Sequence, residues 1–286
     1  MRILLYMLGG AGDVINTTGV ISQLKAQHLD FKLDFLCYKK HYFLVKNHPA
    51  IDNILFAEDF NIGKLSLPDE ADNKLSSFKN YDKIINMWSK KYQGDFPLSK
   101  VKILLDNNIQ LKIKRSDVNG ILFSDIEDYD IVEKFYIKYL KNYSTKKIVL
   151  IEDNSYNASL FNNDEQSKQI IFQKEIAEKL LEHGFLVISN NLPNTIHCKE
   201  LNLIQIKILF QEYCNIFLGL SSGMTTCFFT EGNYKNKIFI ISGKPEWNYC
   251  KYINSMEKYA YLKNYTWETL NANFRIFDRS TKFCES

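Results

Sequence analysis

Short apolar runs alternate with stretches of helical periodicity along the first half of the chain. Residues 2–8, RILLYML, predict a buried strand, the glycine-rich GGAG after them predicts a tight turn, and a helix is predicted from residue 13 onward. Further strands are predicted at residues 32–38, 53–57 and 81–88, with helical stretches at residues 41–46 and 98–107. Because helices connect successive strands, and such crossovers are right-handed, we predict a parallel sheet with helices on both faces.

The same alternation starts again after a weaker pattern at residues 117–145. Strands are predicted at residues 148–152, 185–189, 215–220 and 237–242, and helices at residues 168–183, 203–212 and from the 221–223 turn to residue 231. We therefore predict two α/β domains, an N-terminal one over residues 1–143 and a C-terminal one over residues 144–286. Residues 243–286 are aromatic and rich in lysine, and we expect them to form one or two helices that cross back over the first domain.

Composition and charge narrow the class of protein. The 286 residues are 45% hydrophobic and 24% charged, which is typical of a globular protein and not of a disordered one. The net charge is +3, and nearly all the basic residues are lysines, so bidentate phosphate clamps by arginine are scarce. No basic run is interleaved with aromatic residues in the way that would follow a nucleic-acid backbone. We expect no nucleic-acid partner.

The six cysteines form no C-x-x-C pair, so neither a structural zinc site nor a disulfide framework is expected. No apolar run approaches the roughly 18 residues of a membrane span, and the run at residues 3–8 is shorter than the apolar part of a usual signal peptide. We expect a cytoplasmic protein.

The first glycine turn departs from the fingerprint of a dinucleotide site. That fingerprint requires G-x-G-x-x-G and an acidic residue near the end of the second strand. Here Gly10 and Gly12 are followed by Ile15 where the third glycine belongs, and the second strand ends in Leu-Cys-Tyr. A nicotinamide or flavin site is therefore disfavoured.

Three stretches match one known family in order and spacing. They are GGAGDVINTTGVISQLK at residues 9–25, KLDFLCYKKHYFLVKNHPAIDNILF at residues 32–56 and NIFLGLSSG at residues 215–223. The chain resembles the heptosyltransferases of glycosyltransferase family 9, whose first strand runs into a small-residue turn, Gly-Asp-Val and a helix with Thr-x-Pro. Gly19 stands here in place of that proline. The family also has Asn-Pro-x-Ile-Asp before its third strand, where this chain has NHPAID at residues 47–52.

The resemblance implies a GT-B architecture, in which two Rossmann-like domains with parallel sheets face each other. It implies that the first domain holds the acceptor beside the turn of Gly10, Ala11 and Gly12, and that Asp13 is the catalytic base. Two interpretations of Asp13 remain open from the residues themselves. An aspartate directly after a glycine turn is also a good helix N-cap, and it can serve as both cap and base.

The second domain would hold the donor nucleotide at its own strand-to-helix turn. Free amides and the positive end of a helix favour a diphosphate there, and Gly223 lets the backbone approach closely. The expected donor-site residues are Ser221, Ser222, Gly223, Met224, Thr225, Thr226, Asn154, Ser155 and Lys244. The alternatives are that Ser222 is only a helix cap and that residues 153–157 are only an Asn-rich turn.

The donor turn departs from the common family pattern. Family 9 usually reads Asp-Ser/Thr-Gly-x-x-His here, whereas Ser221 and Thr226 occupy the places of the acid and the histidine. The turn is closer to the Gly-Leu-Ser/Gly-Ser-Gly-Leu version of the branch that heptosylates autotransporter proteins.

Together these features predict an inverting glycosyltransferase without metal or cofactor. We expect it to move heptose from ADP-heptose to a hydroxyl of a bacterial surface glycan, a lipopolysaccharide core or a protein, with peripheral contact to the inner membrane left open. Two alternatives remain. One is the same fold with another nucleotide sugar, and the other is a catalytically inactive GT-B homologue that acts as a binding or scaffold protein.

Overall fold

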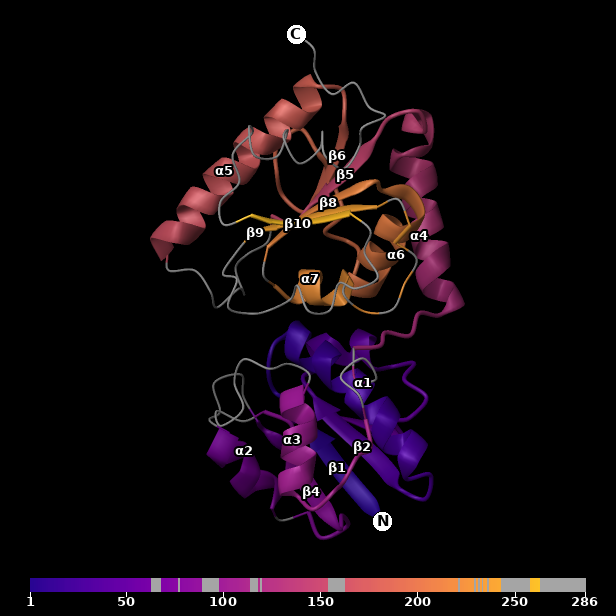
Figure 1. The fold of residues 1–286 in the computed structure, drawn as a ribbon, viewed down its shortest axis with the longest axis vertical. Coiled ribbons are helices and arrows are strands. Elements are labelled where there is room, and N and C mark those ends of the chain that lie inside the picture. The colour runs from indigo at the N-terminus through magenta and orange to yellow at the C-terminus, as the bar shows by residue number, and fades with distance from the viewer. Residues whose placement is uncertain are drawn as a thin grey trace. The chain divides into compact units, whose positions relative to one another are not determined.

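The computed structural model of the protein is shown in Figure 1. It describes residues 1–62, 68–76, 78–88, 98–113, 118, 120–153, 163–220, 222–228, 230, 232, 234–235, 237–242 and 258–262. Along the chain, the first compact unit gives way to the second between Phe123 and Ser124.

The described part of the first unit contains a four-stranded parallel sheet. The strand order is β3 (Asn53–Phe56), β2 (Lys32–Cys37), β1 (Arg2–Tyr6) and β4 (Lys83–Asn86). The helices described in this unit are α1 (Ala11–Gln27), α2 (Pro68–Leu75), α3 (Leu98–Asp106) and the short 3-10 helices η1 (Lys39–Leu44) and η2 (Ala57–Phe60). Strand β1 is buried on both faces, with Ile3 to Tyr6 at most 1% exposed. A parallel sheet covered on both sides explains why this strand reads as a continuous apolar run.

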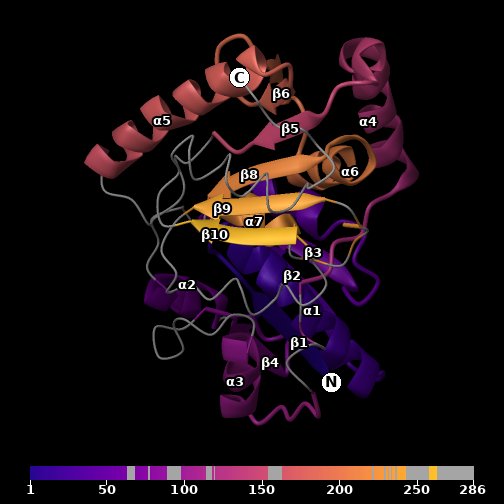
Figure 2. The same cartoon turned by 45° about the horizontal axis from the view of Figure 1, so that its top comes forward.

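The second unit is built on a six-stranded parallel sheet among its described residues. The strand order is β10 (Lys258–Leu262), β9 (Ile238–Ser242), β8 (Ile216–Leu220), β5 (Ile148–Ile151), β6 (Leu186–Ser189) and β7 (Ile196–His197). Figure 2 shows β10, β9, β8, β5 and β6 in this order. The helices of this unit are α4 (Ile126–Tyr139), η5 (Lys141–Tyr143), α5 (Asn163–Glu182), α6 (Leu203–Tyr213) and α7 (Gly223–Phe228).

Alternate residues of the strands supply two different cores to the second sheet. Val149, Ile151 and Leu218 pack with Ile176 and Leu180 of α5 on one face. The opposite face carries aromatic side chains, with the ring of Phe217 lying 4.3 Å from that of Phe228 in α7 and 5.9 Å from that of Phe210 in α6. Helix α5 therefore covers one face of the sheet and helices α6 and α7 cover the other (Figure 1).

The predicted α/β class with two parallel sheets is confirmed, and several element predictions are corrected. Helix α1 begins at Ala11 and not at residue 13. Helix α2, helix α4 in full and strands β7 and β10 were not predicted, and β10 lies in the stretch expected to be helical. The rest of that stretch, residues 243–257 and 263–286, lies outside the described residues.

Helix α4 sets the division between the two units. Its Tyr136 ring stacks on Tyr213 of α6 at 4.1 Å, and Gln205 Nε2 of α6 donates to Asp128 Oδ1 at 3.0 Å. The helix therefore belongs to the second unit, and the division falls between residues 123 and 124. The boundary predicted from the sequence, residues 143 and 144, lies later because the pattern before residue 145 gave no sign of this packing.

Candidate functional site

The turn after β1 brings the predicted acceptor-side residues to the carboxyl edge of the first sheet. Gly10 is the N-cap of α1 in an extended conformation, with φ −72° and ψ 175°. Its carbonyl accepts from the amides of Asp13 and Val14 at 3.1 and 3.2 Å. Ala11 and Gly12 are thus the first two residues of the helix, whereas the sequence predicted that they belong to the turn.

Asp13 stands in the first helical turn and is partly buried. Its Oδ2 accepts a hydrogen bond from the Gly10 amide at 3.0 Å. The residue therefore caps the helix from the third helical position, whereas the sequence placed it at the N-cap. A Cβ atom at Gly9 would overlap the Asp13 carboxyl group, so only glycine at position 9 allows the carboxylate to lie where it does.

A buried lysine that the sequence analysis did not single out lies near this turn. Lys100 of α3 is 1% exposed, and its Nζ donates to the carbonyl of Met87, directly after β4, at 2.6 Å. Burial lowers the pKa of Lys100 to about 8, and the charge of Asp13 opposes that shift. The sequence signal was weak, because Lys100 is one of many lysines and only its place on the inner face of a helix distinguishes it.

His41 of η1 is a second buried ionisable group beside the turn. It is 5% exposed, and burial, together with the charge of Lys40, lowers the pKa of its ring to about 4. A hydrogen bond with the Gly9 backbone acts in the opposite direction and raises this pKa. Its Nε2 has no hydrogen-bond partner among the residues that the structure describes. The ring is thus neutral at pH 7 and packs against the glycine turn.

The second predicted turn lies at the carboxyl end of β8. Ser222 precedes Gly223, the first residue of α7, and its hydroxyl oxygen accepts from the amides of Met224 and Thr225 at 3.1 and 3.3 Å. The interpretation of Ser222 as a helix cap is therefore confirmed. Ser221, Asn154, Ser155 and Lys244, which were also predicted for this site, lie outside the described residues.

The threonines of this helix were predicted to offer hydroxyl groups to a phosphate, and the structure corrects that expectation. Thr225 is 0% exposed and Thr226 is 5% exposed. The Thr225 hydroxyl donates to the carbonyl of Leu220, and the Thr226 hydroxyl donates to the carbonyl of Ser222 at 2.9 Å. Both hydroxyls therefore hold the turn in shape from within.

Glu152, the residue after β5, supplies a buried carboxylate to the same turn. It is 2% exposed and accepts hydrogen bonds from the Leu220 amide at 2.9 Å, from the Ser222 hydroxyl and from the Thr225 hydroxyl at 3.2 Å. Burial raises the pKa of Glu152 to about 7, although these three donors favour the charged form. Glu152 thus ties the carboxyl ends of β5 and β8 together, and the sequence signal was a glutamate directly after an otherwise apolar strand.

Asp153 holds the loop at the carboxyl end of β6 through hydrogen bonds from backbone amides. Its two carboxylate oxygens accept from the amides of Asn190 and Asn191 at 2.8 and 2.6 Å. Asp153 is 7% exposed. Two consecutive carboxylates therefore fix the loops at the carboxyl ends of β6 and β8, the edge at which parallel α/β sheets bind ligands.

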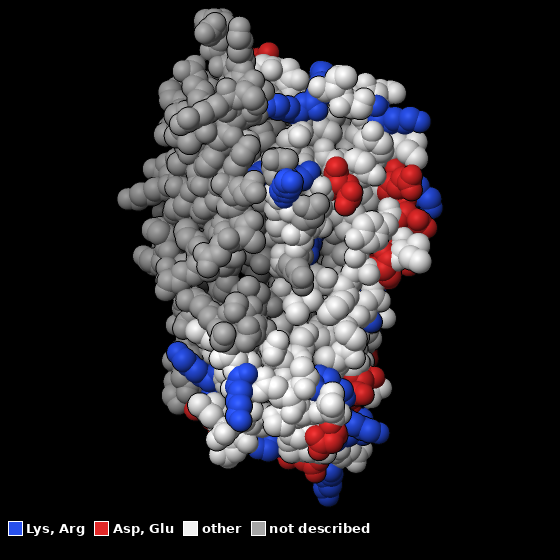
Figure 3. Space-filling view, turned by 45° about the vertical axis from the view of Figure 1, so that its right-hand side comes forward, with Lys and Arg blue, Asp and Glu red and all other residues white. Residues whose placement is uncertain are grey.

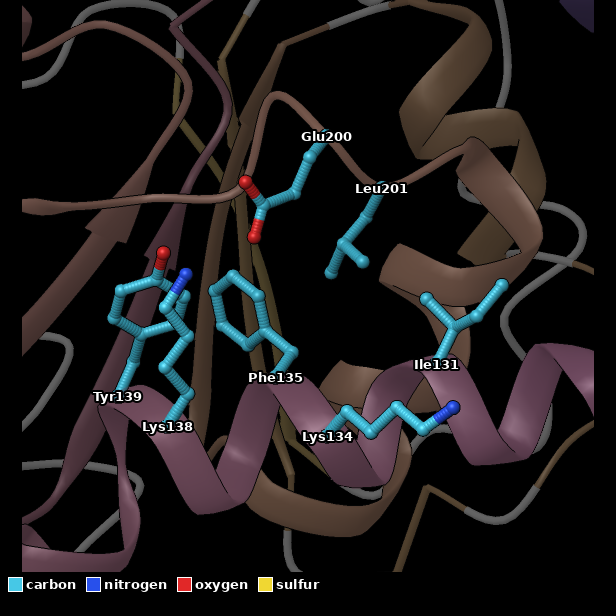
Figure 4. A pocket seen from close by; sticks show the side chains of 7 residues that line it. All are labelled: Ile131, Lys134, Phe135, Lys138, Tyr139, Glu200 and Leu201. Carbon is cyan, nitrogen blue, oxygen red and sulfur yellow. The ribbon is translucent and has the colours of Figure 1, made fainter.

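Other parts of the described surface are weaker candidates for a functional site. A hollow of about 290 Å³ lies between α4 and the loop before α6. It contains none of the predicted site residues, and its lining residues are Ile131, Lys134, Phe135, Lys138, Tyr139, Glu200 and Leu201 (Figure 4). On the face drawn in Figure 3, basic and acidic side chains are interspersed over the described residues and form no continuous basic patch.

The described residues contain neither a metal-binding cluster nor a membrane-spanning helix. No three His, Cys, Asp or Glu side chains among them gather closely enough to hold a metal ion. No helix in the described ranges has both the length and the apolar character needed to cross a bilayer. The four cysteines that the structure describes are all buried and form no disulfide with one another: Cys37, Cys198, Cys214 and Cys227.

No family model matches the chain. A curated relative, lipopolysaccharide heptosyltransferase 1 of Campylobacter coli, is 23% identical over 230 residues, which are 77% of this chain and 64% of that protein. The chain thus spans less than two thirds of the length of this relative.

Two solved structures have the same fold. A family 9 glycosyltransferase of Veillonella parvula has a TM-score of 0.57 at 12% identity and covers 100% of this chain and 90% of its own. The ADP-heptose lipopolysaccharide heptosyltransferase II of Escherichia coli has a TM-score of 0.55 at 12% identity, over 94% of this chain and 92% of its own. The chain therefore has the two-unit α/β fold of the GT-B glycosyltransferases. The predicted resemblance to the heptosyltransferases of glycosyltransferase family 9 is confirmed.

Proposed function

We propose that this protein is an inverting glycosyltransferase that moves a sugar from a nucleotide sugar to a hydroxyl group. A heptose carried by ADP-heptose is the donor that we favour, because both the sequence and the fold resemble family 9. The observation that carries the proposal is Asp13, a partly buried carboxylate fixed at the carboxyl edge of a parallel sheet.

The proposed reaction is a single displacement at the anomeric carbon. The acceptor oxygen bonds to that carbon while the bond from the carbon to the diphosphate oxygen breaks, and the nucleoside diphosphate leaves with the bonding electrons. The Asp13 carboxylate takes the proton of the acceptor hydroxyl. Since the acceptor attacks from the side opposite the leaving group, the anomeric configuration inverts.

For the donor we propose the turn of Ser222 and Gly223 at the carboxyl end of β8. Gly223 lets the backbone approach a diphosphate, and the buried Glu152, Thr225 and Thr226 keep the turn in shape. Ser221, Asn154, Ser155 and Lys244 remain predicted contacts of the donor. Met224 is 8% exposed, and its amide donates a hydrogen bond to the Ser222 hydroxyl oxygen at 3.1 Å.

The acceptor that we propose is a hydroxyl group of a surface glycan, a lipopolysaccharide core or a protein. The sequence of the donor turn is closer to that of the autotransporter branch, which favours a protein acceptor, and this stays a prediction. The absence of metal and cofactor, the cytoplasmic location and peripheral contact with the inner membrane also stay predictions. The reaction requires neither a metal nor a redox group, since a carboxylate base and a diphosphate leaving group balance it.

Mass spectrometry of one mixture tests the donor. We expect transfer when ADP-heptose, GDP-sugars and UDP-sugars are offered together with an acceptor extract, and the added mass identifies the sugar. Asp13→Asn should lower the rate by about a hundredfold or more while leaving the affinity for ADP unchanged. Asp30→Asn, the same change at an exposed position, is the matched control. Full transfer by Asp13→Asn would show that another group is the base.

A catalytically inactive binding protein is the second candidate. The observation that favours it is the pair Ser221 and Thr226, which stand where family 9 usually has an acid and a histidine. Calorimetric titration with a panel of nucleoside diphosphates separates the two proposals. The enzyme should bind one of them with micromolar affinity, whereas a scaffold protein should bind none.

A further inference from the structure

Exposed apolar side chains gather on helix α4 and on η5, which follows it. Of the eight large hydrophobic side chains that are exposed among the described residues, four lie in this short stretch: Ile126, Tyr129, Ile137 and Tyr143. Single exposed apolar residues are ordinary on a protein surface, whereas several on one element mark a contact surface. Helix α4 is therefore the part of the described surface at which a partner is most expected.

The exposed residues of α4 form one face of the helix. Ile126 and Ile137 are about three helical turns apart, so they share a face, and Asp130 and Glu133 lie on it between them. Ile126 is 80% exposed, whereas Phe135, on the opposite face, is 3% exposed. Helix α4 thus packs on the second unit with one face and turns the other to solvent.

The exposed charges of this stretch are sorted by sign along the chain. The acidic side chains come first and the basic ones follow: Glu127, Asp130 and Glu133, then Lys134, Lys138 and Lys141. The helix macrodipole favours such an order only in the first and last turns, but here the sign changes in the middle of the helix, between Glu133 and Lys134. None of the ion pairs of the described residues involves these six side chains.

We propose that the exposed face of α4 pairs with the same face of a second copy of this chain, with the two helices antiparallel. A two-fold axis brings one surface against itself, so the surface must be complementary to itself. The antiparallel approach lays the acidic half of each helix on the basic half of the other, and the exposed isoleucine and tyrosine side chains are covered between them. A partner of uniform charge would instead repel one half of the helix. The pairing does not depend on the proposed sugar transfer.

Sedimentation velocity of the full chain tests the pairing. The wild type should form a dimer at about 100 μM protein, and the dimer should weaken when sodium chloride is raised from about 0.05 M to about 0.5 M, because salt screens the opposed charges. Ile126→Ser should weaken the dimer by about tenfold. Leu29→Ser, the matched control at a side chain that is 79% exposed outside α4, should dimerise as the wild type does. A wild type that stays monomeric would overturn the proposal.

Charge reversal tests the antiparallel orientation. One variant carries Asp130→Lys and Glu133→Lys, which makes the face mostly basic, and the other carries Lys134→Glu and Lys138→Glu, which makes it mostly acidic. Each variant alone should be monomeric, because like charges then oppose each other, whereas an equimolar mixture of the two should form a heterodimer.

The control for charge reversal is the variant with Glu175→Lys and Glu178→Lys, the same change of charge at exposed positions of α5. It should keep the wild-type dimer. A charge-reversed α4 variant that dimerises alone, or a mixture that stays monomeric, would contradict the antiparallel pairing. If circular dichroism shows that a charge reversal lowers the helix content, Ile126→Ser and Leu29→Ser still decide whether α4 is the interface.

Discussion

At the scale of single residues, buried ionisable side chains hold strand ends in place. Lys100 of α3 donates to the Met87 carbonyl directly after β4, and Glu152, the residue after β5, accepts from the Ser222 hydroxyl in the turn after β8. Both groups lose their hydration on burial, and both are held in place by hydrogen bonds within the fold. A turn fixed in this way keeps its amides and side chains in place before a ligand arrives.

Glu152 gives a pH-dependent contribution to stability. Its pKa is about 7 in the folded chain and 4.5 in an exposed carboxyl group. Between these values the folded state keeps a proton that the unfolded state has released, so stability falls as pH rises through this window, by about 1.4 kcal/mol per pH unit. Denaturation of wild type and Glu152→Gln at several pH values should show this fall as the difference between the two curves, because groups that both proteins share, such as His41, contribute equally to each.

The matched control for Glu152 is Glu212→Gln, an exposed position of helix α6. That variant should keep the wild-type slope. Equal slopes in wild type and Glu152→Gln would show that the carboxylate does not retain its proton in the folded chain.

Gly9 and Gly10 should respond differently to alanine. A methyl group at Gly9 would overlap the Asp13 carboxyl group, whereas at Gly10 the nearest atom is Asp13 Oδ2 at 3.9 Å. Gly9→Ala should therefore turn the carboxylate away and expose the Gly10 amide, which hydrogen exchange measures. Gly10→Ala should keep the amide at position 10 protected, and equal protection in both variants would contradict the proposed close approach at Gly9.

At the scale of elements, helix α4 shows why the domain boundary was misplaced. The sequence revealed only its aromatic end, because the helix carries acidic residues at its start and an exposed face. Phe135 is 3% exposed, and the stacked pair Tyr136 and Tyr213 joins α4 to α6, so the tertiary contact identifies the unit to which the helix belongs.

Two substitutions in α4 test this assignment. Phe135→Ala should lower the free energy of unfolding by about 3 kcal/mol, because it leaves a cavity in the second unit. Ile137→Ala, at a side chain that is 54% exposed, should change it by about 0.5 kcal/mol or less. Hydrogen exchange should accelerate in β5 and β8 and stay constant in β1 and β2. Acceleration in the first sheet instead would place α4 with the first unit.

At the scale of the whole molecule, the two units carry different parts of the proposed site. The proposed base is in the first and the proposed donor turn is in the second, each at the carboxyl edge of its own sheet. Each unit therefore presents the edge at which α/β proteins bind their ligands.

Nucleotide binding should protect one unit more than the other. ADP at about 100 times its dissociation constant should stabilise the unit that binds it by about 2.7 kcal/mol. In the presence of ADP, amide hydrogen exchange of the protein should slow in β5, β8 and α7 more than in β1 and β2. Stronger protection of the first sheet would place the nucleotide with Asp13 and contradict the proposed donor turn.

The sequence by itself determined the order of most strands, the two glycine turns, the position of Asp13 after the first of them and the likeness to family 9. Apolar periodicity and turn residues are local signals, so they can be read along the chain. Only the tertiary structure decided that Glu152 supports the Ser222 turn, that Lys100 is buried against the Met87 carbonyl and that α4 belongs to the second unit. These relations join residues that lie far apart in the chain, and burial is what turns an ordinary lysine or glutamate into a group with a shifted pKa.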